Sequence, residues 1–103
     1  MKIVQQTFTI TSSKQQAASS YTPASKIFFQ MKEGGSGLGW VGLSTMSNAG
    51  ADNVSTLDAA AASTPGAAFS IEDQGGWNGL DVSQYYVHGA NAGDKVIVTY
   101  HQA

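Results

Sequence analysis

Residues 72–81, Glu-Asp-Gln-Gly-Gly-Trp-Asn-Gly-Leu-Asp, hold the densest group of side chains that could perform chemistry. Asp73, Asn78 and Asp81 offer the oxygen atoms that calcium prefers, but their spacing differs from that of an EF-hand loop, which needs closer carboxylates and a terminal glutamate. We therefore favour an exposed turn over a calcium site. Trp77 lies between a glycine and an asparagine, so we expect it to anchor an interface or to stack on a sugar ring.

The two histidines, His88 and His101, lie on adjacent predicted strands. A zinc site needs three or four ligands with supporting partners, and the sequence offers no third ligand at a suitable spacing. We expect two partly exposed strand histidines. No metal and no cofactor are predicted.

Catalytic arrangements are weak throughout the chain. Glu33 and Glu72 could form a carboxylate pair of the kind that hydrolyses glycosides, but each is expected at the end of a strand, where a charge marks the surface. Residues 35–40 begin like a dinucleotide fingerprint, yet Trp40 stands in place of the third glycine and no helix is expected to follow. Ser36 lacks a plausible base. We predict no catalytic residues and no enzyme activity.

Composition excludes several classes of partner. The chain has 103 residues, which we treat as a single domain (1–103), with 12% charged residues and a net charge of −2. All five cations are lysines, so the arginines that usually recognise phosphate and guanine are absent and a nucleic-acid partner is not expected. Cysteine is also absent. No apolar run approaches the ~20 residues of a membrane-spanning helix, and the polar residues after Val4 leave no signal-peptide core, so no membrane partner is expected.

The dominant hydrophobic period is two, which indicates strands. Residues 7–11 alternate, and residues 26–32 place Ile27, Phe29 and Met31 on one face. Residues 40–44 look like the return partner of that strand across a glycine-rich turn. Residues 68–72 alternate again. Residues 85–100 predict two strands joined as a hairpin by a turn rich in glycine, asparagine and aspartate.

These patterns predict an all-β fold: a small antiparallel β-sandwich or jelly-roll-like barrel of roughly six to eight strands, with the C-terminal strand paired to the Tyr85 strand. Residues 12–20 are expected to be a loop, and residues 56–62 a loop with room for a turn or two of helix. The predicted core comprises Phe8, Ile10, Ile27, Phe29, Met31, Val41, Leu43, Phe69, Ile71, Tyr85, Val87, Val96 and Val98.

The order of these parts resembles the small β-sandwich virion proteins of tailed bacteriophages. A strand pair around a glycine-containing turn ends in a Val-Gly-Leu-like step, here Val41-Gly42-Leu43. A variable loop then leads to Pro65-Gly66 and to a Phe-x-Ile strand, here Phe69-Ser70-Ile71. An aspartate-hydroxyl step enters an aromatic strand at residues 81–87, and a turn with a final valine strand follows at residues 90–100. The loop at residues 47–64 is longer than in the usual form.

This resemblance implies a structural protein on the outside of the particle, acting in head decoration, as cement or at a fibre base, without catalysis. Its implied partner is the major capsid protein or another virion protein, its implied location is the virion assembled in the host cytoplasm, and a homo-oligomer is expected, with a trimer favoured to match local three-fold sites. We expect Trp40, Trp77 and Tyr86 to make the contacts. The alternative is a small carbohydrate-binding, lectin-like module, because surface aromatic residues on a β-sandwich also stack on sugars.

Overall fold

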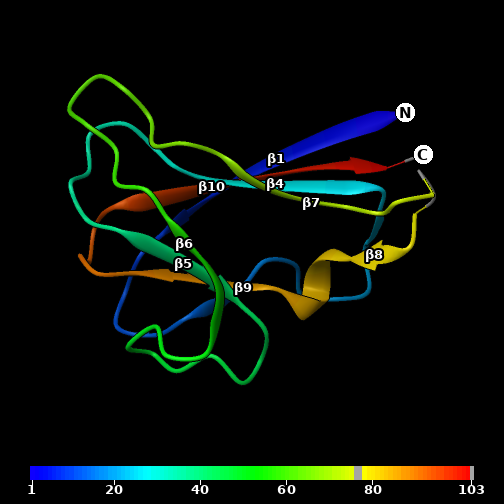
Figure 1. The fold of residues 1–103 in the computed structure, drawn as a ribbon, viewed down its shortest axis with the longest axis horizontal. Coiled ribbons are helices and arrows are strands. Elements are labelled where there is room, and N and C mark those ends of the chain that lie inside the picture. Colours follow the sequence, from blue (N-terminus) through cyan, green and yellow to red (C-terminus); the bar gives the residue numbers. More distant parts are fainter. Residues whose placement is uncertain (76–77, 103) are drawn as a thin grey trace.

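The computed structural model describes residues 1–75 and 78–102, and its fold is all-β, as predicted. Two four-stranded antiparallel sheets lie one over the other as two layers (Figure 1). The first sheet has the strand order β1 (Lys2–Thr9), β10 (Lys95–Gln102), β4 (Lys26–Met31) and β7 (Phe69–Glu72). The second has the order β2 (Gln15–Gln16), β9 (Tyr86–Gly89), β5 (Gly39–Gly42) and β6 (Asn53–Leu57). A short pair, β3 (Pro23–Ala24) with β8 (Leu80–Asp81), precedes the 3-10 helix η1 (Val82–Gln84).

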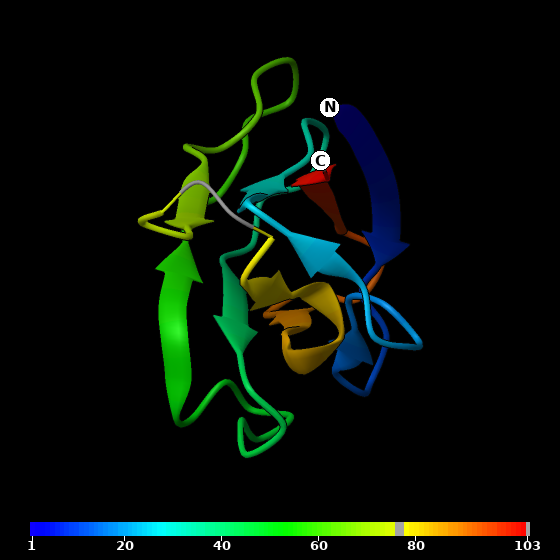
Figure 2. The same ribbon diagram turned by 90° about the vertical axis from the view of Figure 1, so that its right-hand side faces the viewer.

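The strand order is that of a jelly roll. The antiparallel pair β1 and β10 continues across the sandwich as the pair β2 and β9, and the pair β4 and β7 continues as β5 and β6. Successive strands such as β4 and β5 therefore lie in opposite sheets, which is how two Greek keys close a sandwich. β1 forms one outer side of the molecule and β6 lies at the far side of the other sheet (Figure 2).

Two strand pairings predicted from the sequence are wrong for this reason. β9 pairs with β5 and β2, and β10 pairs with β1 and β4, so residues 85–100 do not form a hairpin. The turn between them bonds other segments instead: the Gly93 N–H donates to the Ile10 carbonyl, and the Ala90 N–H donates to the Leu38 carbonyl. Likewise β5 is not the return partner of β4. The glycine-rich segment between them carries the chain from one sheet to the other.

The core lies between the inner faces of the sheets and largely matches the prediction. Eight of the expected residues are at most 3% exposed: Ile10, Ile27, Phe29, Met31, Val41, Val87, Val96 and Val98. Phe8, Phe69, Ile71 and Tyr85 are half-buried against them. Leu43 is wrong: it follows β5 and is 44% exposed. The core also includes residues outside the prediction, Ala17, Ala24, Leu57, Val82 and Tyr100.

Two segments predicted as loops contain strand. Residues 12–20 include β2, and the expected helical segment at residues 56–62 begins with the last two residues of β6. Leu57 is buried at the end of that strand, so the chain gains core contact there by remaining extended, which outweighs the helix propensity of the alanines that follow. No helix in the described part of the chain has the length and apolar character needed to cross a membrane.

Candidate binding surfaces

Two of the three predicted contact residues share one surface. In the register of β5 with β9, Trp40 lies opposite His88 and Gly42 lies opposite Tyr86. Because opposite residues of an antiparallel pair lie on one face, Trp40 and Tyr86 both occupy the outer face of the second sheet. Trp77, the third, lies outside the described residues. The structure therefore brings Trp40 and Tyr86 together.

Trp40, however, is half-buried beneath a loop of its own chain. Gly50 in that loop, residues 43–52, has φ +84°, and a Cβ added there would lie 2.5 Å from the Trp40 ring. Met46 of the same loop is fully buried against Gly42. The expectation that Trp40 is a free surface anchor is therefore incomplete, since one side of its indole is already covered.

Lys14 fixes this loop to the rest of the molecule. Its ammonium group donates to the carbonyls of Ser44 and Met46, both at 2.5 Å, and its backbone N–H donates to Asn48 Oδ1 at 2.9 Å. The same ammonium group lies 5.2 Å from the centroid of the Tyr86 ring. The Lys14 ammonium group therefore stabilises the loop through two charge-assisted hydrogen bonds, and its contact with the Tyr86 ring adds a cation–π interaction.

The histidine prediction needs correction. His88 is only 5% exposed, packed with its ring centroid 5.9 Å from that of Trp40, and its Nδ1 has no hydrogen-bond partner among the described residues. His101 is half-buried, but on β10 in the other sheet. The two imidazoles therefore do not converge. The burial of His88 depends on its tertiary packing beside Trp40, for which the sequence gives no local signal.

Tyr86 lies at a shallow hollow of about 370 Å³ that opens to solvent. The other lining residues come from the loop that follows β5 and from η1: Leu43, Ser44, Ser83 and Gln84. An aromatic ring beside hydroxyl and amide groups has the chemistry of a small polar ligand site with an apolar floor.

Two of the three residues considered as calcium ligands, Asp73 and Asp81, bond to other parts of the chain. The Asp81 carboxylate caps η1: Oδ1 accepts from the backbone N–H of Thr22 and of Ser83, each at 3.0 Å, and from the Ser83 hydroxyl at 2.8 Å. The Thr22 bond is the main cause that lowers the pKa of Asp81 below its usual value. Burial, assisted by the charge of Asp81, raises the pKa of the neighbouring Tyr85 phenol. Asp73 accepts from the Gly79 N–H at 3.2 Å. Within residues 1–75 and 78–102, no group of three or more His, Asp or Glu side chains is placed to hold a metal ion.

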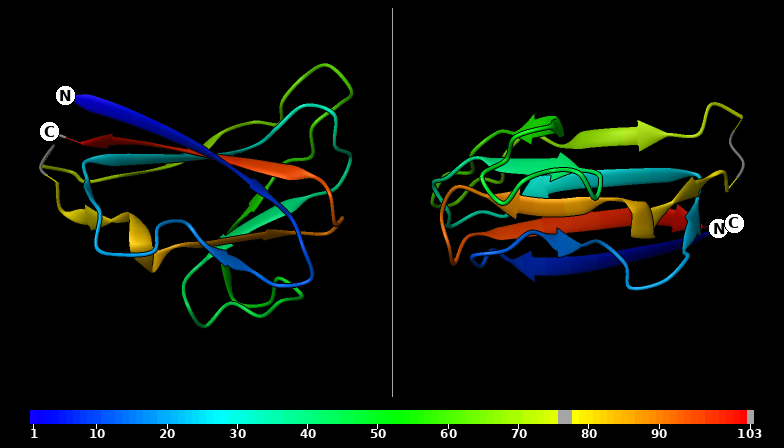
Figure 3. Two further views of the ribbon diagram at one scale, coloured as in Figure 1. Left: turned by 180° about the vertical axis from the view of Figure 1, so that it is seen from behind. Right: turned by 90° about the horizontal axis from the view of Figure 1, so that it is seen from below.

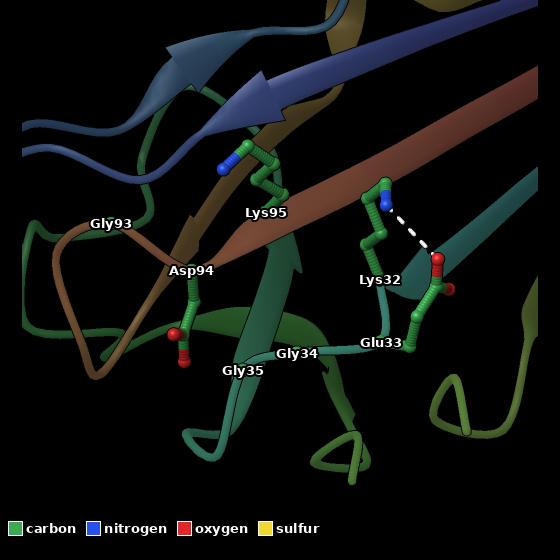
Figure 4. A pocket seen from close by; sticks show the side chains of 7 residues that line it. All are labelled: Lys32, Glu33, Gly34, Gly35, Gly93, Asp94 and Lys95. Atoms are coloured by element: carbon green, nitrogen blue, oxygen red, sulfur yellow. Dashed lines mark hydrogen bonds and ion pairs between the residues drawn. The ribbon is translucent and has the colours of Figure 1, made fainter. Parts of the chain in front are cut away.

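The glycine-rich segment between β4 and β5 is bonded to an aspartate of the same chain. The backbone N–H groups of Ser36 and Gly37 donate to Asp94 Oδ2 at 3.3 and 2.9 Å. An internal carboxylate thus takes the place that a phosphate would occupy in a nucleotide-binding loop. Beside it a hollow of about 170 Å³ is flanked by Lys32, which pairs with Glu33 at 3.0 Å (Figure 4).

The outer face of the first sheet carries an aromatic and apolar surface that the sequence analysis missed. Phe28 on β4 and His101 on β10 have ring centroids 5.4 Å apart, and Lys26 places its ammonium group 4.9 Å from the Phe28 ring while pairing with Glu72 at 3.6 Å. Ile3 on β1 lies opposite His101 and is 59% exposed. The alternation of residues 26–32 placed Phe28 on the outer face, and that was the available signal.

No protein-family model, no curated protein and no solved structure matches this chain.

Proposed function

We propose that this chain is a non-enzymatic structural protein of a tailed-bacteriophage virion, decorating or cementing the capsid surface through protein–protein contacts. The resemblance in strand order supports this role. The jelly roll also supports it, because this architecture serves both viral capsid proteins and lectins. The proposal places the protein on the assembled particle, with the major capsid protein or another virion protein as its partner and with several copies acting together.

One observation carries the proposal: the outer face of the first sheet. Ile3, Phe28, Ile97 and His101 lie on neighbouring strands with their side chains on that face. Interfaces are enriched in aromatic residues and depleted in charge at their centre. The chain as a whole has few charges, and those beside Phe28, on Lys26 and Glu72, pair with each other. A broad face of this kind suits contact with the flat surface of a capsid better than it suits a small molecule.

Five of the seven carboxylates have partners within the chain, which supports a role without catalysis. Glu33 and Glu72 pair with lysines, and Asp73, Asp81 and Asp94 accept backbone N–H groups. Acid–base chemistry needs carboxylates or imidazoles with free access to a substrate. These groups instead maintain turns and strand ends.

Binding to particles that lack this protein tests the proposal. We expect the chain to co-sediment with such particles and Phe28→Ala to weaken binding roughly 30-fold, the effect of losing a hot-spot residue worth about 2 kcal/mol. Tyr21→Ala is the matched control, since Tyr21 is 71% exposed in the loop between β2 and β3 and does not belong to the first sheet. Trp77→Ala tests the sequence-based expectation for that residue. A chain that does not bind particles, or Phe28→Ala with unchanged binding, would refute the proposed contact.

The hollow at Tyr86 favours a second candidate function, a carbohydrate-binding module. Its aromatic ring, hydroxyls and the Gln84 amide match what sugar recognition uses. A glycan array read with wild-type chain and with Tyr86→Ala separates the two. Sugar binding that Tyr86→Ala abolishes, in a chain without affinity for particles, would establish the carbohydrate reading.

A further inference from the structure

The edge strand β1 is long and unprotected. It pairs with β10 in an unbroken register over all eight residues, Lys2–Thr9, and no described strand pairs with its other side. The other sheet edges are shorter, with four residues in β7, five in β6 and two in β2. Natural proteins usually shield an edge with prolines, bulges, charges or a covering segment. After Lys2, β1 has no proline, no bulge and no charge, and it lies outermost in the molecule (Figure 3).

The backbone groups that face outward can be identified. The Ile10 N–H donates to the Asp94 carbonyl at 2.8 Å, so the groups of even-numbered residues in β1 point toward β10. The odd-numbered residues point the other way, and the Thr9 carbonyl confirms this by accepting from the Gln15 side chain at 2.5 Å. Ile3, Gln5 and Thr7 therefore present N–H and C=O groups that have no partner among the described residues.

The side chains of this edge are also incompletely covered. Val4, Gln6 and Phe8 lie opposite Tyr100, Val98 and Val96, so they belong to the inner face. Val4 and Phe8 are nevertheless only half-buried and Gln6 is exposed. A hollow of about 360 Å³ separates Gln6 and Phe8 from residues 16–20, because the facing edge strand β2 is too short to cover them.

We propose that β1 pairs antiparallel with β1 of a second copy, about a two-fold axis at Gln6, so that two sheets join into one of eight strands. A two-fold axis perpendicular to the sheet keeps both inner faces on one side, which requires even residues opposite even residues. Centring on Gln6 places Gln5 opposite the partner's Thr7, a pair whose backbone groups both face outward. It also places Val4 opposite the partner's Phe8, on the side of the hollow.

The charges and side chains of the strand favour a second copy as its occupant. Residues 3–9 are uncharged, so self-pairing opposes no like charges, and antiparallel pairing sends the two copies of Lys2 to opposite ends. The narrow, non-hydrogen-bonded pairs bring Val4 and the partner's Phe8 close enough to bury each other. The two Gln6 amides meet at the axis, where each can donate to the other. This pairing goes beyond the proposed function and does not depend on a capsid partner.

Sedimentation velocity of the purified full chain tests the pairing, with a dimer expected. Thr7→Pro removes an outward N–H and no bond to β10, so we expect the fold to persist, as judged by circular dichroism, and association to weaken at least tenfold. A wild-type chain that stays monomeric at the highest soluble concentration would overturn the proposal. A wild-type trimer would also overturn it, because an isologous contact at β1 closes a pair and leaves no surface for a third copy.

If Thr7→Pro fails to fold, charged substitutions at the two-fold axis test the pairing instead. Gln6→Glu and Gln6→Lys should each weaken self-association about fivefold at low salt, since like charges then meet across the axis. Mixing the two variants should restore a dimer containing one of each. Ser70→Glu and Ser70→Lys, at an exposed position of the opposite edge strand β7, are the matched controls. Dimers unchanged by the Gln6 variants, or not restored by mixing, would place the contact elsewhere.

Discussion

Val98 offers the sharpest test of which strand faces form the core. It is fully buried on β10, the strand between β1 and β4, with Gln6 on one side and Phe29 on the other. Val98→Ala removes two methyl groups, a transfer loss of roughly 1.6 kcal/mol, and the cavity left behind brings the total to about 2–3 kcal/mol. For a domain of this size the melting temperature should fall by roughly 10–20 °C.

Val98→Asp should be far more severe. The substitution loses the same apolar burial and adds an unpaired carboxylate in the core, which costs several kcal/mol more. A total stability of about 5–15 kcal/mol leaves little or none after such a loss. We expect an unfolded or insoluble chain, measured by circular dichroism and urea titration.

Ile97 is the matched control on the adjacent position. It lies on the outer face of β10, opposite Thr7 and Gln30, and is only half-buried. Ile97→Ala should cost about 1 kcal/mol or less, and Ile97→Asp should remain folded. A folded Val98→Asp beside an unfolded Ile97→Asp would show that the inner and outer faces of β10 are reversed.

Three shorter predictions concern loops and caps. Gly50→Ala should cost roughly 1–3 kcal/mol in urea titration, because a Cβ there combines positive φ with a collision with Trp40, and the tryptophan fluorescence should shift to the red as the loop lifts. Asp94→Ala should cost about 1–2 kcal/mol by leaving two backbone donors of the glycine-rich segment unsatisfied, while Asp94→Asn, which keeps an acceptor, should cost less. The folded-state pKa of Asp81 lies below its unfolded value near 4. The ionised carboxylate therefore contributes to folding stability above pH ~4, and this contribution disappears as the pH falls through the folded-state pKa. Asp81→Ala should lower the melting temperature at pH 7 and should make the melting temperature decline less steeply below pH ~4.

The sequence predicted the faces of the strands better than their partners. Alternation identified Ile27, Phe29 and Met31 as one buried face and identified Val96 and Val98 as another, because a period of two is a local property. Partner choice is not local. In this jelly roll, β4 and β5 lie in opposite sheets, as do β9 and β10. The glycine-rich segments that follow β4 and β9, which usually indicate hairpins, therefore mark crossings between layers.

The candidate surfaces likewise depend on local features that the sequence indicates and on tertiary contacts that it does not. Trp40 was expected to make surface contacts, but Gly50, ten residues later, covers it, and only the tertiary path of loop 43–52 reveals that contact. His88, packed beside Trp40, is buried as well. Phe28 was readable as an outward residue, yet its place beside His101 depends on the pairing of β4 with β10, which the sequence did not reveal.

Self-pairing through β1 would also change the binding of this chain to its proposed capsid partner, and this can be measured. Joining two first sheets edge to edge leaves their outer faces free and places two copies of the Phe28 surface side by side, so a dimer can contact a repeating lattice twice. The second contact is then intramolecular and raises apparent affinity, typically 10²–10⁴-fold where the geometry allows both contacts. Gln6 belongs to the inner face of β1, so Gln6→Glu alters no outer-face residue. We expect this variant to weaken co-sedimentation with particles at chain concentrations where the wild-type chain is dimeric, and we expect an equal mixture with Gln6→Lys to restore it. Particle binding that is unchanged by Gln6→Glu, in a variant shown to be monomeric, would mean that each copy binds the capsid on its own.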